Sequence, residues 1–163
     1  LPFQDHNDLH LKLFEHFFDV KVVESLLHSS NIVRIKEKEI SFLAEKLDMD
    51  DTDMEKFCAV LVEKFSLQLV LVTRGQSGVC AFDKDKGAFV DPGYKINMKD
   101  NIGSGMAFSA GFLHYYLNRK SIQDALNFGN AAGALNATKA GATAFFNKND
   151  VLNFMKKTTK RDE

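Results

Sequence analysis

The run "LQLVLVT" at residues 67–73 constrains the fold more than any other feature of the chain. Its apolar and β-branched side chains do not alternate with polar ones, which is typical of a strand buried on both faces. Such strands occur in parallel sheets, where consecutive strands are joined by crossover helices. The run therefore predicts an α/β fold with a mostly parallel sheet and flanking helices.

The segments around this run have the patterns that such a fold needs. "NIVRIK" at residues 31–36 is typical of a second strand, and "VCAF" and "GAFVD" on either side of "DKDKG" predict a β-hairpin. Helical patterns occupy residues 20–27, 39–47, 54–65, 105–118, 121–139 and 149–157. We expect helix caps at Thr52 or Asp53, at Ser121, and at Asn149 or Asp150, with Gly141 ending the fifth helix.

The two ends of the chain differ from this middle part. Residues 1–8 form a polar lead-in that contains Pro2, and the next ten residues have helical spacing of Leu9, Leu13, Phe14, Phe17 and Phe18. The last residues, "KKTTKRDE", are charged and are predicted to be frayed. We therefore divide the chain into an atypical lead-in (1–19), a folded portion (20–157) and a charged tail (158–163).

Composition and charge exclude several classes of protein. The formal net charge is −1 and no basic face is evident, which disfavours a nucleic-acid partner. No apolar run is long enough to cross a membrane, and no signal peptide is recognised. Cys58 and Cys80 lack the spacing of metal ligands and are expected to be buried thiols in a reducing compartment, which indicates a cytoplasmic protein.

The stretch "DNIGSGMAFSAGF" at residues 100–112 has the pattern of an anion-binding turn. Gly103, Ser104 and Gly105 can point successive backbone N–H groups at one place, and the helix that follows adds the positive end of its dipole. The same residues are also compatible with a plain turn between loop and helix. The next residue is Met106, whose thioether cannot accept a proton.

Two further segments have features of a ligand site. "VTRGQSG" follows the buried strand, where α/β proteins bind ligands, and offers the Thr73 hydroxyl and a close backbone approach at Gly75. "NFGNAAGAL" at residues 127–135 gathers small side chains on one helix. Close helix–sheet packing explains its alanines but not the lone polar Asn130.

Taken together, these segments resemble the carbohydrate kinases of the ribokinase or PfkB type, including fructokinases. The resemblance runs from about Val20 to Phe154 and implies a partial ribokinase-like fold, its C-terminal nucleotide-binding portion. Four segments carry it in the family's order: "SSNIVRIKEKEISFL", "LVLVTRGQSG", "DNIGSGMAFSAGFL" and "NAAGALNATKAGA".

The resemblance implies transfer of the γ-phosphoryl group of ATP to a sugar hydroxyl, fructose for example, with Mg²⁺ and in many members K⁺. Gly103, Ser104 and Gly105 would form the anion hole. The binding site for the nucleotide, ATP or ADP, would be lined by Thr73, Gly75, Gly78, Gly103, Gly105 and Asn130. The metal-site residues would be Glu39, from the family's Asn-x-x-Glu motif at the Mg²⁺ and phosphate site, and, for the monovalent cation, Asp100 with the carbonyl groups of Ile102, Asn136, Lys139 and Gly141.

Three departures from the family pattern argue against catalysis. Met106 stands at the position of the catalytic Asp, and loss of a general base typically lowers a rate by about 10²–10⁴-fold. Lys36 replaces the Asn of Asn-x-x-Glu, although "KEKE" is equally compatible with a solvated charged turn. The N-terminal half that carries the sugar-binding residues and lid is not recognised, and the first twenty residues do not resemble the strand expected just upstream.

Three functional hypotheses follow. The chain is a sugar-kinase relative that keeps the nucleotide half and has lost catalysis, a pseudoenzyme. Alternatively, since it starts at Leu1, it is part of an active kinase whose N-terminal half is elsewhere. The third hypothesis is a non-catalytic interaction module, in which a second copy or a protein partner covers the apolar face left by the absent half.

Overall fold

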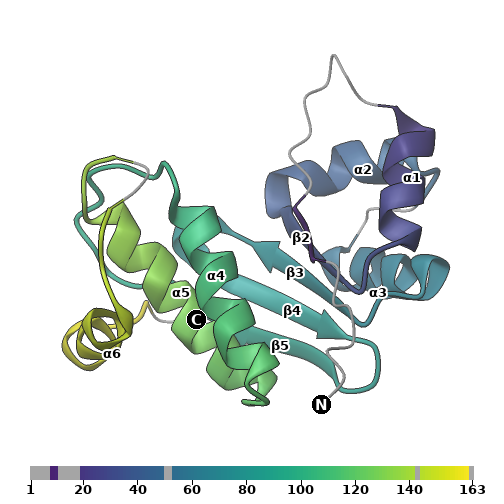
Figure 1. Ribbon diagram of the computed structural model, residues 1–163. Coiled ribbons are helices and arrows are strands. Elements are labelled where there is room, and N and C mark those ends of the chain that lie inside the picture. Colours follow the sequence, from purple (N-terminus) through teal and green to yellow (C-terminus); the bar gives the residue numbers. More distant parts are fainter. Residues whose placement is uncertain (1–7, 11–18, 50–52, 142–143, 162–163) are drawn as a thin grey trace. The chain divides into compact units, whose positions relative to one another are not determined.

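The computed structural model describes residues 8–10, 19–49, 53–141 and 144–161 (Figure 1). Two short 3₁₀ helices, η2 (Glu37–Glu39) and η3 (Gly75–Ser77), follow the second and third strands. The remaining elements are, in chain order, β1 (Asp8–His10), α1 (Val20–His28), β2 (Ile32–Lys36), α2 (Ile40–Lys46), α3 (Met54–Phe65), β3 (Leu69–Thr73), β4 (Val79–Asp83), β5 (Gly87–Asp91), α4 (Ser104–Leu117), α5 (Ile122–Ala137) and α6 (Lys148–Lys157).

The strands form one sheet in the order β1-β2-β3-β4-β5. β1 pairs with β2 and β2 pairs with β3 in parallel, with Val33 opposite Val70. The first four residues of β3 are buried, as its uninterrupted apolar pattern predicts. β4 and β5 are neighbours joined by residues 84–86. The predicted α/β fold with flanking helices and a hairpin is confirmed, and the sheet is mixed, with β1, β2 and β3 parallel.

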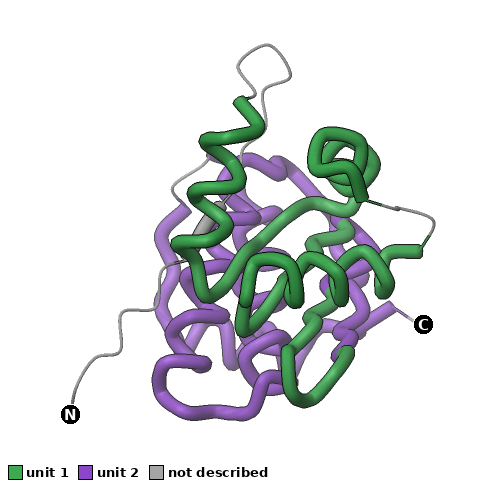
Figure 2. Tube along the Cα trace, turned by 90° about the vertical axis from the view of Figure 1, so that its right-hand side faces the viewer, with its two compact units in different colours: residues 1–74, 80–88 green, residues 75–79, 89–163 purple. Residues whose placement is uncertain are grey.

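The chain divides into two compact units, coloured separately in Figure 2. Unit 1 comprises residues 1–74 and 80–88, and unit 2 comprises residues 75–79 and 89–163. In unit 1, alternate strand residues face a core that the helices α1, α2 and α3 complete. Its members include Val33, Ile35, Val70, Val72, Leu27, Leu43, Phe57, Phe65 and both cysteines.

Close contact between α4 and α5 organises unit 2. A Cβ atom on Gly129 would lie 3.0 Å from the Phe108 carbonyl oxygen, and one on Gly111 would lie 3.1 Å from the Gly129 Cα atom. The rings of Tyr115 and Phe128 stack with their centroids 4.1 Å apart. The small residues of α5 therefore allow a helix–helix approach, whereas the sequence had suggested helix–sheet packing.

Most predicted caps are confirmed, and one is wrong. Asp53 caps α3 by accepting the backbone N–H of Glu55 at 2.7 Å, and Ser121 caps α5. Thr52, the other candidate, lies outside the described residues. α6 is capped by Asn147, and not by Asn149 or Asp150, because the Asn147 and Asp150 side chains each accept the other residue's backbone N–H.

The fifth helix ends earlier than Gly141, the predicted stop. α5 ends at Ala137 and is capped by Thr138, whose backbone N–H already bonds the carbonyl group of Ala134. Gly141 lies beyond the helix with φ 87°, in the left-handed region that favours glycine. Its role is therefore in the loop after α5.

The predictions for both ends of the chain need correction. Leu9 lies in strand β1 and not in a helix. Residues 8–10 pair in parallel with Ile32, Val33 and Arg34 of β2. The other residues of that predicted helix, Leu13, Phe14, Phe17 and Phe18, lie outside the described residues.

At the C-terminal end, residues 159–161 are not frayed. The backbone N–H of Lys95 donates to the carbonyl oxygen of Thr159 at 2.9 Å, and Tyr94 and Lys160 form an antiparallel bridge. Among the described residues, no helix combines the length and apolar character needed to cross a bilayer.

Candidate functional site

The predicted anion-binding turn lies at the N-terminus of α4. Gly103 occupies the cap position with φ 82°, a left-handed conformation that glycine adopts without steric cost. Ser104 Oγ donates to the carbonyl oxygen of Asn101 at 2.7 Å, so the hydroxyl braces the turn. None of the hydrogen bonds among the described residues uses the backbone N–H groups of Gly105 and Met106. These groups and the helix dipole suit an anion.

The C-terminal end of α5 holds this turn in place. The Asn136 side chain, 2% exposed, donates from Nδ2 to the carbonyl oxygen of Ile102 at 2.9 Å. The backbone N–H of Lys99 donates to the Ala137 carbonyl oxygen at 2.9 Å. The loop before α4 is thus tied to α5 by side-chain and backbone bonds, which fix the conformation of the turn.

The residues predicted for a monovalent cation are largely brought together. Asp100 Oδ1 accepts the backbone N–H of Ile102 at 2.9 Å, and its Oδ2 accepts that of Gly141 at 3.1 Å. Asn136 joins them through its bond to Ile102. The backbone N–H of Lys139 donates to the Asn136 carbonyl oxygen at 3.0 Å. A carboxylate and carbonyl oxygens are ligands of the kind that K⁺ takes, and the assignment of these residues to a cation stays a prediction.

Met106 lies in the first turn of α4 and is 61% exposed. Its side chain stands one residue after the turn, at the position that the family resemblance assigns to the catalytic Asp. A thioether neither accepts a proton at neutral pH nor carries a negative charge. The Met106 side chain therefore cannot serve as a general base.

Glu39, predicted for the Mg²⁺ site, is engaged by Lys36. Its Oε2 accepts the Lys36 backbone N–H at 2.9 Å, and its Oε1 lies 3.5 Å from Lys36 Nζ. Among the described residues, no group of three or more His, Cys, Asp and Glu side chains could hold a metal ion. Protein-bound Mg²⁺ is usually held by one or two carboxylates. A lone carboxylate already paired with an ammonium group does not fit this ion.

Two glycines predicted at the nucleotide site play different roles. Gly75 has φ 60°, and a Cβ atom there would meet nothing within 4 Å. Gly78 has φ 83°, and a Cβ atom would collide with the Asp91 carbonyl oxygen and lie 2.6 Å from Gly93 N. Gly75 therefore borders open space, whereas Gly78 is required by the packing of the chain at residues 91–93.

The Thr73 hydroxyl, also predicted at the nucleotide site, is used within unit 1. It donates to the carbonyl oxygen of Ile35 at 3.2 Å and so links the ends of β2 and β3. The structure describes Thr73 and Glu39 in unit 1, and the other predicted site residues in unit 2. Their assignment to a nucleotide or a metal stays a prediction.

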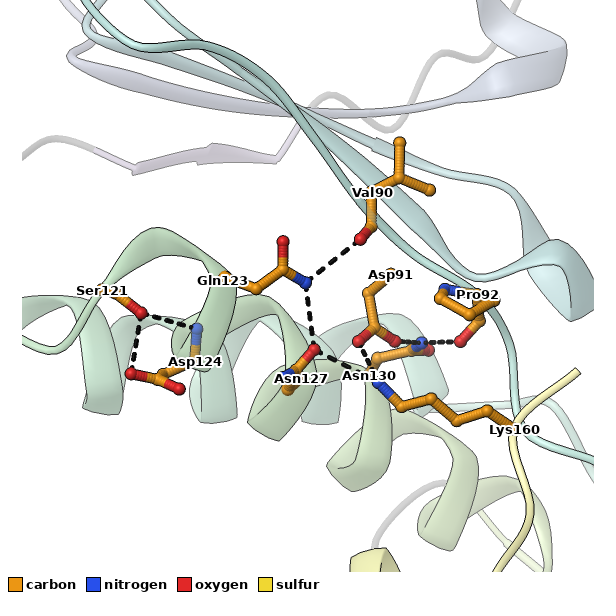
Figure 3. A network of polar contacts seen from close by, with 9 residues as sticks. All are labelled: Val90, Asp91, Pro92, Ser121, Gln123, Asp124, Asn127, Asn130 and Lys160. Carbon is orange, nitrogen blue, oxygen red and sulfur yellow. Dashed lines mark hydrogen bonds and ion pairs between the residues drawn. The ribbon is translucent and has the colours of Figure 1, made fainter. Parts of the chain in front are cut away.

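Asn130 is part of a polar network in unit 2 (Figure 3). Its Nδ2 donates to Asp91 Oδ1 and, at 2.8 Å, to the Pro92 carbonyl oxygen. Asp91 is fully buried at 0% exposure and forms an ion pair with Lys160. Lys160 Nζ also donates to Asn127 Oδ1 at 3.2 Å. The network fixes the orientation of the Asn130 side chain.

Sequence reasoning missed Asp91 and Lys160. The position of Asp91 at the end of a strand and before "PG" was a usable signal for a polar role. No signal pointed to Lys160, since 69 positions separate it from Asp91. Beside this pair, burial and the Asp91 carboxylate raise the pKa of the Tyr94 hydroxyl above its ordinary value of 10.0.

Comparison with known proteins identifies the family. Residues 8–149 match the family model described as pfkB family carbohydrate kinase. This chain belongs to the pfkB family of carbohydrate kinases. Among curated relatives, it is 31% identical over 126 residues to Fructokinase-1 of Oryza sativa subsp. japonica, a match that covers 72% of this chain and 37% of that protein. It is 30% identical over 119 residues to a ribokinase of Haemophilus influenzae, a match that covers 73% and 38% of the two chains.

Solved structures of the same family share the fold. The chain superposes on a ribokinase from Thermotoga maritima with a TM-score of 0.74 at 25% identity, over 82% of this chain and 44% of that one. It superposes on a fructokinase from Xylella fastidiosa, described with bound ATP, with a TM-score of 0.79 at 22% identity, over 91% and 51%. A fructokinase double mutant from Vibrio cholerae is described with fructose, ADP and potassium (TM-score 0.73, 24% identity, 91% and 49% covered). This pfkB-family chain thus spans about half the length of these structures.

Proposed function

We propose that this chain binds the phosphate groups of ATP or ADP at the turn before α4 and does not catalyse phosphoryl transfer. The position of Met106 carries the proposal, because it places an exposed thioether directly after the phosphate-binding turn. The family relationship and the ATP- and ADP-bound relatives support a nucleotide as the ligand. The Gly103 turn, held by α5, supports retained binding.

The loss of transfer follows from the chemistry of the missing base. A sugar hydroxyl must lose a proton as it attacks the γ-phosphorus, and a positioned base accelerates that step by about 10²–10⁴-fold. The thioether of Met106 cannot take the proton. The backbone N–H groups at the start of α4 can still stabilise phosphate charge, which is a binding contribution that does not need the base.

We also propose a monovalent cation beside this turn, which the potassium ion described in the Vibrio cholerae fructokinase supports. Asp100 and the carbonyl groups of Ile102, Asn136, Lys139 and Gly141 would hold it, and it would supply positive charge next to the phosphate groups. Asp100 and Asn136 hold the loop before α4 with or without a cation. Asp100 accepts the backbone N–H of Gly141, and Asn136 donates to the carbonyl oxygen of Ile102.

Binding is tested by calorimetric titration of the full chain with ADP and with ATP. The variant Gly105→Glu places a carboxylate in the first turn of α4, where it repels phosphate but suits the helix dipole. We expect it to weaken ADP affinity by about tenfold or more. The matched control is Asn149→Glu, which adds the same charge to the first turn of α6 and should leave affinity unchanged.

Two results would contradict this proposal. Absence of any ADP or ATP binding at millimolar concentration would favour a non-catalytic interaction module. Phosphorylation of fructose or ribose by the wild-type chain, measured by coupled ADP release, would contradict the loss of transfer. We expect Met106→Asp alone to leave the chain without measurable transfer, because the expected sugar-binding residues are not recognised in it.

A further inference from the structure

We infer that the Lys36–Glu39 ion pair takes the place of a divalent cation in this chain, so that Glu39 holds no Mg²⁺. This inference does not depend on the proposed nucleotide binding. The family resemblance places Mg²⁺ at the Asn-x-x-Glu motif, and the geometry of "KEKE" in this chain disagrees with that expectation.

The geometry shows a carboxylate whose two oxygens are both engaged by one residue. β2 ends at Lys36 and η2 begins immediately after it, so the chain turns and returns Glu39 to Lys36. The Lys36 backbone N–H donates to Oε2 at 2.9 Å, and Lys36 Nζ lies 3.5 Å from Oε1. The Glu39 side chain is only 12% exposed, whereas that of Lys36 is 40% exposed.

These contacts leave no place for Mg²⁺ at Glu39. The ion requires near-octahedral coordination and keeps several of its waters, so it needs open space around the carboxylate oxygen. Here the carboxylate is largely enclosed, and an ammonium group lies beside it. A divalent ion would have to approach that like charge or displace it. An asparagine at position 36 would carry no charge and would leave the carboxylate net negative.

The inference has a test that needs no nucleotide. Mn²⁺ alone is titrated into the ¹⁵N-labelled full chain, and paramagnetic broadening of the backbone amide signals of residues 37–40 is measured. We expect little broadening there in the wild type, at least threefold more in Lys36→Asn, and none of that gain in Lys36→Asn/Glu39→Gln. Lys46→Asn is the matched control, because it removes another lysine paired with a glutamate, Glu45.

Either of two results would overturn the inference. One is preferential broadening of residues 37–40 in the wild type that Glu39→Gln removes, which would show that Glu39 holds the metal despite Lys36. The other is the absence of any gain in Lys36→Asn, which would show that the ion pair does not keep the metal out. The proposed nucleotide binding is untouched by both results.

Discussion

Two lysine–carboxylate pairs in this molecule differ in sequence separation and in the burial of the carboxylate. Lys36 and Glu39, the exposed pair, are three positions apart, and their side chains are 40% and 12% exposed. Lys160 and Asp91, the buried pair, are 69 positions apart, and their side chains are 35% and 0% exposed. The exposed pair forms through local chain geometry, and water and salt reach its lysine. The buried pair exists only because the segment at residues 159–161 pairs with residues 93–95.

The comparison shows that a lysine–carboxylate ion pair can have different roles at different places in the molecule. A buried carboxylate must be compensated, and Asp91 receives Asn130 Nδ2 and Lys160 Nζ. That pair therefore belongs to the stability of unit 2. The exposed pair is expected to contribute little to stability, and its proposed role is to keep a divalent ion away from Glu39. Four predictions test this contrast, from the largest expected effect to the smallest.

Removing the charge of Lys160 should have the largest effect. Lys160→Met leaves Asp91 buried with Asn130 as its remaining described partner, and should lower the free energy of unfolding by about 3 kcal/mol. Urea denaturation measures this. The double variant Asp91→Asn/Lys160→Met should recover part of the loss, because no charge is then buried. A loss below about 0.5 kcal/mol in Lys160→Met would place this pair in the same class as the exposed one.

The turn that supports Asp91 gives the second prediction. Gly78→Ala should lower the free energy of unfolding by about 2–3 kcal/mol, because a left-handed alanine is strained and its Cβ collides with the backbone at Asp91. Gly75→Ala is the matched control, since it is also left-handed but meets open space, and should lose only about 1 kcal/mol. Equal losses of stability in Gly78→Ala and Gly75→Ala, in thermal or urea unfolding, would show that the contact with the Asp91 backbone adds no destabilisation.

The third prediction concerns alkaline pH near the buried pair. The pKa of Tyr94 is raised in the folded state by burial and by Asp91, so the unfolded chain loses this proton at a lower pH. Stability is therefore fully present below pH 10 and falls above it, by up to about 1.4 kcal/mol per pH unit for one proton. Tyr94→Phe keeps the ring and should make the fall between pH 10 and 11 shallower in urea denaturation. Identical slopes would contradict the raised pKa.

The smallest effect is expected at the exposed pair. Lys36→Met should change the free energy of unfolding by about 0.5 kcal/mol or less, and the change should shrink further in high salt. Urea denaturation at two salt concentrations checks this, with Lys46→Met as the control at the other exposed pair. A loss as large as that of Lys160→Met would mean that the pair is structural, and the contrast with Asp91 would fail.

Local patterns allowed most elements to be predicted. The uninterrupted apolar residues of β3 predicted a buried parallel strand, and the turn residues between β4 and β5 predicted the hairpin. Asp53 and Ser121 predicted the starts of two helices. The turn at Gly103 and the position of Met106 were also visible in the sequence, because glycines before a helix and the residue after them are a contiguous pattern. Each of these signals spans only a few residues.

The features that could not be predicted depend on partners distant in the chain. β1 is three residues long and carries no pattern of its own, so its pairing with β2 defines it. Asn147 was passed over as a cap because Asn149 and Asp150 are equally good candidates by residue type. The hydrogen bond from Asn136 to Ile102 joins residues 34 positions apart, and no local sequence pattern predicts it.

The sequence by itself determined the α/β class, the glycine turn before α4 and the thioether at position 106, because backbone propensity and residue chemistry are local properties. Only the tertiary structure decided that α5 braces the turn and that Lys160 compensates Asp91. Burial and hydrogen-bond geometry decide whether a charge is free, paired or excluded from water, and these arise when distant segments pack together.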